Sequence, residues 1–401
     1  MRPLKSLISL DEGLRMCLES VSPVERTEML PILEAVGRVV AADVVSRIHV
    51  PLVDRAAMDG YAVRAQDTYG ATKFKPKVLR QIERLYASSV PRKRIAPGDC
   101  TEVATGSTLP MGADGVVMVE DTEAEGDGIH VLSPVHPMEN VSRQGEDIGQ
   151  GEAVIRAGER LTPAKAGVVT AIGLDRVRVF TKPRVAILAT GDEVVPPGRK
   201  IRPGQVFDIN SYTLAAVVAQ NGGEPVRLPR VADTMPALRQ ALRRSAREDL
   251  VVFSGGSSVG EKDLIMDVLR DMGELLFHGI AVKPGKPTVL GRIGSTAVLG
   301  MPGYPTSCLS NAYMLLVPML RCMTRLPPDP PRVLDLPLAR KIVSVVGRVE
   351  FHTVRVENGQ AVPAYKESGA ITSMAHADGY VQIPANVDLI EKGERVKVIL
   401  F

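Results

Sequence analysis

The chain of 401 residues has no tryptophan, and aromatic residues make up only 4% of it. This scarcity counts against a site that stacks sugars or bases. Cys17, Cys100, Cys308 and Cys322 form no Cys-x-x-Cys pair, and the six histidines are dispersed. The cysteine spacing argues against a zinc ribbon or a disulfide framework and fits a reducing cytosol, and the histidines outline no metal site.

Long apolar runs are also missing from the chain. No uninterrupted apolar stretch reaches the ~18 residues of a membrane helix, and the N-terminus lacks the apolar core of a signal peptide. We therefore expect a soluble, cytoplasmic protein with no membrane partner. The 49 basic and 46 acidic residues leave a net charge of +3, which is too balanced to indicate nucleic acid as a partner.

Periodicity divides the first half of the chain into two kinds of structure. Apolar residues at helical spacing predict helices within residues 5–45, with Ser9 as an N-cap, and again over 164–172, closed by Gly173. Between them lie short alternating apolar runs with glycine turns, which are typical of strands. We therefore predict a β-rich domain II over 49–145, inserted into a helical or mixed domain I formed by 1–48 and 146–183.

Residues 184–326 alternate apolar strands with helices. Strands are predicted at 184–189, 224–228, 250–253, 288–290 and 297–299, and helices at 211–221, 235–247, 264–271 and 307–319. This alternation indicates domain III, a doubly wound α/β domain with a parallel sheet covered on both faces. Past a stiff proline-rich linker, residues 327–401 predict a small β-barrel or sandwich, domain IV. The fold class is thus multidomain α/β.

The most distinctive segment is 251–263, VVFSGGSSVGEKD, where a glycine-rich loop joins an apolar strand to a helix. Glycines let a ligand approach the backbone, and a helix N-terminus favours an anion. The spacing matches neither a Walker A loop nor Gly-x-Gly-x-x-Gly, so the loop alone predicts an anion site, with a plain tight turn as the alternative. Residues 190–193, Asp233 and 302–307 also follow predicted strands, and we expect them to share one ligand-binding rim.

Two further segments carry charge that can serve a site. Lys283 and Lys286 stand three residues apart in a Pro/Gly-stiffened loop, where both ammonium groups can converge on one anion; two solvated lysines are the alternative. Asp59 precedes Gly60, and spacing alone favours a type I′ turn there. No Ser-His-Asp or Cys-His arrangement supports nucleophilic catalysis. The residues therefore indicate a phosphate or oxyanion site, with carboxylates that hold a divalent cation.

Short motifs also follow one another in a distinctive order. They are AMDGYA at 57–62, ATG at 104–106, RQGEDI at 143–148, ATGDE at 189–193, the glycine loop at 254–263, KPGKP at 283–287, PGYPTS at 302–307, GR at 347–348 and ITS at 371–373. Together they resemble the molybdopterin molybdenumtransferases, called MoeA in prokaryotes and the E domain of gephyrin in animals. The resemblance covers nearly the whole chain.

This resemblance implies an enzyme that takes adenylylated molybdopterin and molybdate and, with Mg²⁺, yields the molybdenum cofactor and AMP. It implies a four-domain homodimer in which domain II of one chain lies over the α/β site of the other. Domain III resembles a small molybdopterin adenylyltransferase, and transient contact with that enzyme is expected.

Site residues follow from the resemblance by motif position. The implied catalytic residues are Asp59, Thr105, Asp147, Glu193, Asp233 and Asp263. The implied substrate-binding residues are Gly255, Gly256, Ser257, Ser258, Gly260, Lys283, Lys286, Pro302, Ser307, Arg348 and Ser373. Glu193 and Asp263 are the expected Mg²⁺ ligands.

Some alternatives stay open at the level of sequence. Ser257 and Tyr304 depart from the residues more common in the family motifs, so the oxyanion is either molybdate or tungstate. The protein could instead be a molybdopterin adenylyltransferase, although that activity does not need the extra domains. It could also be a non-catalytic scaffold on the same fold, against which the intact set of carboxylates and lysines argues.

Overall fold

The computed structural model describes residues 7–255, 264–327, 331–364 and 370–401. The chain forms two compact units. The larger unit combines Met1–Glu28 with Phe180–Phe401, and the smaller unit is Met29–Val179. Within the described ranges, no helix is both long enough and apolar enough to cross a bilayer.

A six-stranded sheet forms the core of the larger unit, in the order β16-β13-β17-β21-β20-β18. Its strands are β13 (Arg184–Ala189), β16 (Glu224–Arg227), β17 (Leu250–Ser254), β18 (Glu274–His278), β20 (Val289–Ile293) and β21 (Thr296–Met301). The first four strands in this order are parallel, whereas β20 is antiparallel to both of its neighbours. The sequence-based prediction of a parallel sheet is therefore wrong at this edge.

The antiparallel edge has a local cause. Strands β20 and β21 are joined by the two residues Gly294 and Ser295, and Ile293 pairs with Thr296. A two-residue connection with glycine at positive φ (+60°) makes a hairpin, and a hairpin can join only antiparallel strands. Strand β18 is not predicted from the sequence, because a single glycine separates it from the preceding helix.

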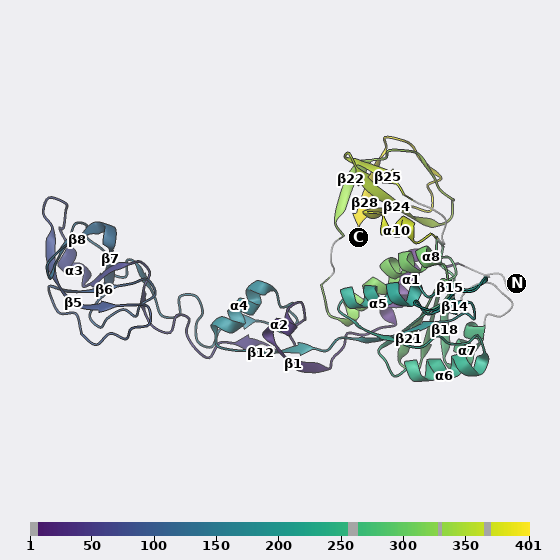
Figure 1. Ribbon diagram of the computed structural model, residues 1–401, viewed down its shortest axis with the longest axis horizontal. Coiled ribbons are helices and arrows are strands. Elements are labelled where there is room, and N and C mark those ends of the chain that lie inside the picture. The colour runs from purple at the N-terminus through teal and green to yellow at the C-terminus, as the bar shows by residue number, and fades with distance from the viewer. Residues whose placement is uncertain (1–6, 256–263, 328–330, 365–369) are drawn as a thin grey trace. The chain divides into compact units, whose positions relative to one another are not determined.

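Helices cover both faces of this sheet, as Figure 1 shows. One face packs against α1 (Leu10–Glu19), α5 (Asn210–Gln220), α8 (Pro305–Asn311) and α9 (Val317–Met323), with a π-helical turn at Ala312–Leu316 between α8 and α9. The other face packs against α6 (Met235–Ser245) and α7 (Leu264–Met272). On β13, Val185 and Ile187 enter the first layer and Ala186 and Leu188 enter the second, because successive side chains of a strand point to opposite faces.

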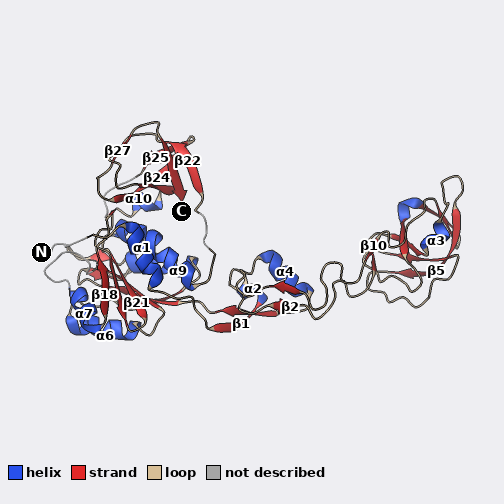
Figure 2. Cartoon of the chain, turned by 180° about the vertical axis from the view of Figure 1, so that it is seen from behind, coloured by secondary structure: helices blue, strands red, loops and turns tan. Residues whose placement is uncertain are grey.

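The C-terminal region of the larger unit is mostly antiparallel (Figure 2). Its elements are β22 (Val333–Pro337), β23 (Ile342–Val343), β24 (Val349–Glu357), β25 (Gln360–Pro363), α10 (Thr372–Ala375), β26 (Gly379–Ile383), β27 (Leu389–Ile390) and β28 (Arg395–Leu400). The sheet has the order β19-β24-β26-β28-β22, with β25 also paired to β24. Strand β19 (Val282–Lys283) comes from the α/β region, so the C-terminal sheet is hydrogen-bonded directly to the predicted lysine loop.

The smaller unit has a mixed six-stranded sheet in the order β7-β4-β6-β5-β9-β8. These strands are β4 (Gly60–Val63), β5 (Lys77–Leu85), β6 (Asp99–Val103), β7 (Gly115–Met118), β8 (Thr122–Glu125) and β9 (Gly128–Val131). A separate apolar cluster combines residues 32–44 with 148–179 and includes α4 (Pro163–Ala171). The short elements are α2 (Ile32–Ala35), α3 (Ala65–Thr68), β2 (Val44–Val45), β3 (Arg55–Ala56), β10 (Val141–Ser142) and β11 (Ala153–Ile155).

The helical prediction for residues 5–45 is right only at its start. Ser9 caps α1 by accepting a hydrogen bond from the backbone N–H of Glu12 at 3.1 Å. Beyond it, the chain forms β1 (Thr27–Pro31) and one short helical turn, α2, which ends at Ala35 shortly before Gly37, with φ +87°. Val39, which fits a helical period, pairs instead with the distant Arg160, and the N–H of the next residue, Val40, donates to the carbonyl of Glu159. β-Branched residues favour such pairing, and a local period cannot detect it.

Candidate functional site

The carboxyl edge of the central sheet is the natural place for a ligand. Strand β13 is followed along the chain by β16 on one side of it and by β17 on the other, so the winding direction reverses between β13 and β17. In open α/β sheets, ligands bind outside the carboxyl ends of the strands at this switch point. Thr190, Gly255 and Pro302 follow β13, β17 and β21 at this edge.

Backbone contacts hold the strand ends together at the switch point. The N–H of Thr190 donates to the carbonyl of Ser254 at 3.1 Å, and the N–H of Gly255 donates to that of Met301 at 3.3 Å. Gly255 has φ +90°, and a Cβ there would lie 2.8 Å from the carbonyl oxygen of Thr190. Only glycine fits this crossing. The predicted residues Gly256, Ser257, Ser258, Gly260 and Asp263 lie outside the described residues.

Carboxylates gather beside β13 and β16 at the same edge. Burial raises the pKa of Asp233 above its ordinary value, and the charges of Asp192 and Glu193 raise this pKa further. The positive charge of Arg230 lowers the pKa of Asp233 and so opposes these effects. Nη1 of Arg230 donates to the carbonyl of Gly191 at 3.0 Å and to Oδ1 of Asp192 at 3.2 Å. The structure therefore brings Glu193 and Asp233 into one electrostatic group.

Sequence reasoning did not single out Arg230. It follows β16 at the carboxyl edge, just as Thr190 follows β13, and Thr190 bridges to Val231 in parallel register. Its position three residues after the end of β16 was the signal that could have identified it.

The segment after β21 lines the middle of the edge. Nδ2 of Asn210, at the start of α5, donates to the carbonyl of Gly303 at 2.8 Å. Ser307 lies in the first turns of α8 and is only 4% exposed. Ser307 is therefore part of the wall of the rim, whereas the neighbouring Tyr304 side chain is 66% exposed.

The lysine loop lies at the same edge, on the far side from the carboxylates. It joins β18 to β20, and because β18 runs parallel to β21, the loop meets the carboxyl ends of the parallel strands. Lys283 Nζ forms an ion pair with Oε1 of Glu350, a buried residue of β24. Burial lowers the pKa of the nearby His352 to about 4, a shift that Glu350 opposes and Lys283 reinforces. Imidazole is then neutral at pH 7, so Lys283 is the cation facing Glu350.

The two predicted residues of the C-terminal region are placed differently. Arg348 directly precedes β24, and the N–H of the next residue, Val349, donates to the carbonyl of Ala281 at 2.9 Å. Arg348 is thus beside the lysine loop. Ser373 lies in α10, is 2% exposed and donates its hydroxyl to the carbonyl of Ala370 at 2.8 Å. No contact of Ser373 with the lysine loop is seen in the described part of the chain.

The smaller unit brings together two of its three predicted site residues. The backbone N–H and the hydroxyl of Thr105 both donate to Oδ1 of Asp59, at 2.6 and 2.8 Å. These two hydrogen bonds lower the pKa of Asp59, which is fully exposed. Asp147 is also exposed, and its N–H donates to the carbonyl of Val50 at 3.1 Å.

The type I′ turn that spacing favours at Asp59 is wrong. Gly60 opens strand β4, which pairs with β6 and β7 rather than closing a hairpin at that point. A Cβ on Gly60 would lie 1.9 Å from the carbonyl oxygen of Val117. Glycine is needed there for close strand approach, and Asp59 stands where β4 begins, opposite the end of β6.

The comparisons with known proteins all indicate the same family. The MoeA N-terminal region (domain I and II) matches residues 8–173, a probable molybdopterin binding domain matches 186–322, and the MoeA C-terminal region (domain IV) matches 335–401. Molybdopterin molybdenumtransferase 2 of Mycobacterium tuberculosis is 32% identical over 92% of this chain and 94% of its own length. Molybdopterin molybdenumtransferase of Bacillus subtilis is 28% identical over 98% and 94%.

Solved structures agree with the sequence matches. The crystal structure of a molybdopterin biosynthesis MoeA protein from Pyrococcus horikoshii is 38% identical, covers 98% of this chain and 99% of its own, and superposes with a TM-score of 0.87. A second structure of a MoeA protein from the same organism has a TM-score of 0.84 at 33% identity. The family models, the relatives of similar length and the solved structures with a mixed α/β fold all agree. The chain therefore belongs to the MoeA family.

Proposed function

We propose that this enzyme of molybdenum cofactor biosynthesis inserts molybdate, or the nearly isosteric tungstate, into adenylylated molybdopterin and releases AMP. Family membership and relatives named molybdopterin molybdenumtransferase support the transferase reaction. The observation that carries the proposal is the charge order along the carboxyl edge. Carboxylates lie beside β13 and β16, and lysines lie beyond β21, in the loop that leads into β20.

This order suits a substrate with two different ends. Neighbouring strands lie ~4.8 Å apart, so three spacings from β13 to β20 separate the acidic and basic groups by about 14 Å. An adenylylated pterin has an anionic phosphoanhydride, and the oxyanion is a second negative centre. Lys283, Lys286 and Arg348 would neutralise the oxyanion, while the strand ends at Gly255 let a phosphate approach the backbone.

The acidic group fits a Mg²⁺ ion in its donor chemistry. Mg²⁺ is commonly held by one or two carboxylates together with substrate phosphates, so a closed cage of protein ligands is not required. Accordingly, the described residues contain no group of three or more His, Cys, Asp or Glu side chains arranged for a metal. Glu193, with Asp263 from outside the described residues, would hold the ion, which polarises the phosphoanhydride when bound. Burial raises the pKa of Asp233, and the charges of Asp192 and Glu193 raise it further; a cation would relieve this second contribution.

The chain's own residues then act by position and charge. Arg230 orients the turn that carries Asp192 and Glu193 through its hydrogen bond to Gly191. In the smaller unit, Thr105 keeps Asp59 ionised by donating two hydrogen bonds to one carboxylate oxygen. We place Asp59, Thr105 and Asp147 at the active site of the partner chain in a homodimer.

The organisation that accompanies this function is also proposed. Domain I is 1–48 with 146–183, domain II is 49–145, domain III is 184–326 with an adenylyltransferase-like fold, and domain IV is a β-barrel over 327–401. The enzyme works in the cytoplasm and meets the molybdopterin adenylyltransferase transiently to receive its substrate.

The test is a reconstituted reaction with purified protein, adenylylated molybdopterin, Mg²⁺ and either molybdate or tungstate. We expect AMP release that depends on the oxyanion, with metal retained on the pterin, and a large loss in Lys286→Ala and Asp59→Asn. Lys341→Ala, an exposed lysine of the C-terminal region, is the matched control and should keep full activity. Tight pterin binding without AMP release with either oxyanion would favour a scaffold instead.

A further inference from the structure

The loop that carries Lys283 and Lys286 is closed at its base by backbone hydrogen bonds. The N–H groups of Ile280 and Thr288 both donate to the carbonyl of Lys286, each at 3.0 Å. The N–H of Gly279 donates to the carbonyl of Thr288 at 2.7 Å. These bonds fix where the loop leaves the sheet, but they do not reach Gly285, which lies between the two lysines.

Gly285 is held from the helical layer instead. Its carbonyl oxygen accepts a hydrogen bond from Nδ2 of Asn311 at 2.9 Å and another from the hydroxyl of Thr288 at 2.8 Å. Nδ2 of Asn311 also contacts Oγ1 of Thr288. Gly285 has φ +112°, and a Cβ there would lie 2.2 Å from Oδ1 of Asn311. The loop can therefore rest on the Asn311 amide only because residue 285 is glycine.

The stability of the fold alone does not explain an asparagine at position 311. Asn311 is fully buried at the end of α8, directly before the π-helical turn. Its Oδ1 has no hydrogen-bond partner among the described residues, and an unpaired buried acceptor costs about 1–3 kcal/mol. A leucine, which branches at Cγ as asparagine does, has no polar atom that would carry this cost. π-Helical turns inside α-helices occur frequently at functional sites.

We infer that Asn311 is a positioning residue of the oxyanion site, which sets the lysine loop so that Lys283 and Lys286 converge on the substrate. This inference rests on the proposed function. A loop that already has its bound conformation loses less conformational entropy when the oxyanion binds. A small displacement of a charged group from its place in the site lowers the reaction rate strongly.

The two lysines depend on Asn311 to different degrees. Lys283 has a second restraint, because it is paired with Glu350 and its neighbour Val282 is in register with Val349. Lys286 has no ion pair or side-chain hydrogen bond within the described ranges. Its place is therefore set by the loop backbone, and loosening Gly285 displaces Lys286 most.

The test replaces Asn311 with leucine, which keeps the branching at Cγ and removes both the donor and the unpaired acceptor. We expect Asn311→Leu to raise the KM for molybdate about tenfold, with kcat and the KM for the adenylylated pterin within about twofold of the parent. Ser310→Ala is the matched control. Ser310 is equally buried on the same helix, but its hydroxyl donates to Ser307 and not to the loop.

A second readout does not depend on activity. Hydrogen exchange in the peptide covering 279–288 should become faster in Asn311→Leu and stay unchanged in Ser310→Ala, while exchange in β21 should be the same in all three proteins. Thr288→Val removes the other donor to Gly285, and it repeats the test if Asn311→Leu does not fold.

The outcomes separate the two claims. Absence of oxyanion-dependent AMP release by the parent protein refutes the proposed function, whereas the exchange measurement still reports on the loop. Unchanged exchange in 279–288 refutes the role of Asn311 in holding the loop. Faster exchange with an unchanged KM for molybdate refutes its role in oxyanion binding.

Discussion

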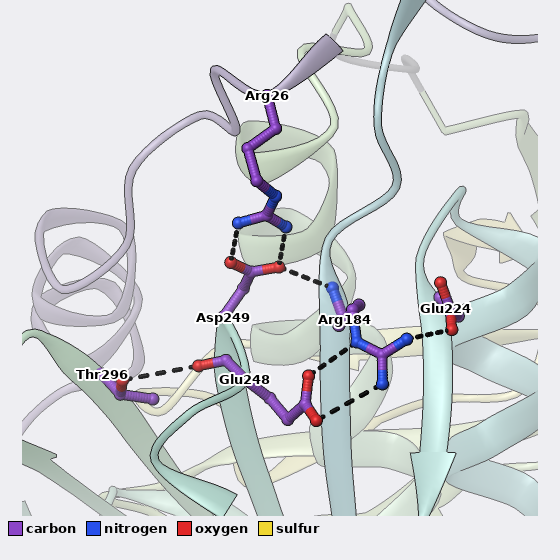
Figure 3. A network of polar contacts seen from close by, with 6 residues as sticks. All are labelled: Arg26, Arg184, Glu224, Glu248, Asp249 and Thr296. Carbon is purple, nitrogen blue, oxygen red and sulfur yellow. Dashed lines mark hydrogen bonds and ion pairs between the residues drawn. The ribbon is translucent and has the colours of Figure 1, made fainter. Parts of the chain in front are cut away.

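At the amino edge of the central sheet, charged side chains of opposite sign satisfy one another, as Figure 3 shows. Arg26 Nη1 and Nη2 donate to the two carboxylate oxygens of Asp249 at 2.8 and 2.7 Å. The N–H of Arg184 donates to the same carboxylate at 2.7 Å, and the Arg184 guanidinium pairs with Glu224 and Glu248. At the carboxyl edge, Asp192, Glu193 and Asp233 instead share one sign of charge beside Arg230.

This contrast between the two edges is seen in the pKa values of two aspartates, Asp249 at the amino edge and Asp233 at the carboxyl edge. Burial alone would raise the pKa of Asp249, but the hydrogen bonds from Arg26 and Arg184 outweigh it and the pKa is lowered. Burial and like charges raise the pKa of Asp233. A paired edge stabilises the fold, whereas like charges gathered at one edge are typical of a functional site.

The largest expected effect is on activity at the carboxyl edge. Asp233→Asn should lower kcat/KM on the order of 100-fold, because the variant loses a negative charge that would support the proposed Mg²⁺ ion. Its thermal stability should be unchanged or higher, since a source of repulsion is removed. Steady-state AMP release and the melting temperature measure the two effects. Full activity with lowered stability would mean that Asp233, like Asp249, stabilises the fold and does not serve the reaction.

The reverse result is expected at the amino edge. Asp249→Asn should destabilise the protein by about 1–3 kcal/mol in denaturant unfolding, because it breaks charge-assisted hydrogen bonds at a mostly buried carboxylate. The kcat/KM should stay within about twofold of the parent. Asp335→Asn is the control, since its pair with Arg395 is exposed on both sides and should contribute less than about 1 kcal/mol.

The two aspartates should also give stability opposite dependences on pH. For Asp249 the folded pKa is lowered, so its contribution is present above the unfolded pKa and is lost as pH falls through the folded pKa. For Asp233 the folded pKa is raised, so stability decreases as pH rises from the unfolded toward the folded pKa. The free energy of unfolding, measured across the acidic pH range, should no longer show the first dependence in Asp249→Asn and no longer show the second in Asp233→Asn. Parallel curves for parent and both variants would contradict this.

The smallest effect is the response to Mg²⁺ alone. If Mg²⁺ binds at the proposed site, millimolar Mg²⁺ should raise the melting temperature of the parent by a few degrees at most, because a ligand that binds only the folded state stabilises that state. Glu193→Gln and Asp233→Asn should reduce this shift, and Asp249→Asn should keep it. An equal shift in all four proteins would place the ion elsewhere.

Elements set by local signals can be predicted from the sequence in both units. The strand Arg184–Ala189 is confirmed residue for residue, and helix α4 ends just before Gly173, which has φ +80°. Both rest on local signals, a continuous apolar run and a glycine that stops a helix. The motif order likewise predicts the MoeA family, which the comparisons confirm.

The parts that could not be predicted depend on pairing between distant segments. Val39 matches a helical period but pairs with Arg160, and Asp59 meets Thr105 only because β4 lies against β6. Glu350 and Asn311 carry no motif. Their proximity to Lys283 and Gly285 comes from sequence separations of 67 and 26 residues.

By itself, the sequence determined the family, the α/β alternation and the chemical types at the site, because these depend on residue identity and local order. The tertiary structure decided which charges face one another. Sheet order places carboxylates at one end of the rim and lysines at the other, and it gives Asp233 and Asp249 opposite pKa shifts. Burial and Coulomb interactions act through space, so residues of one type acquire different properties only once the chain has folded.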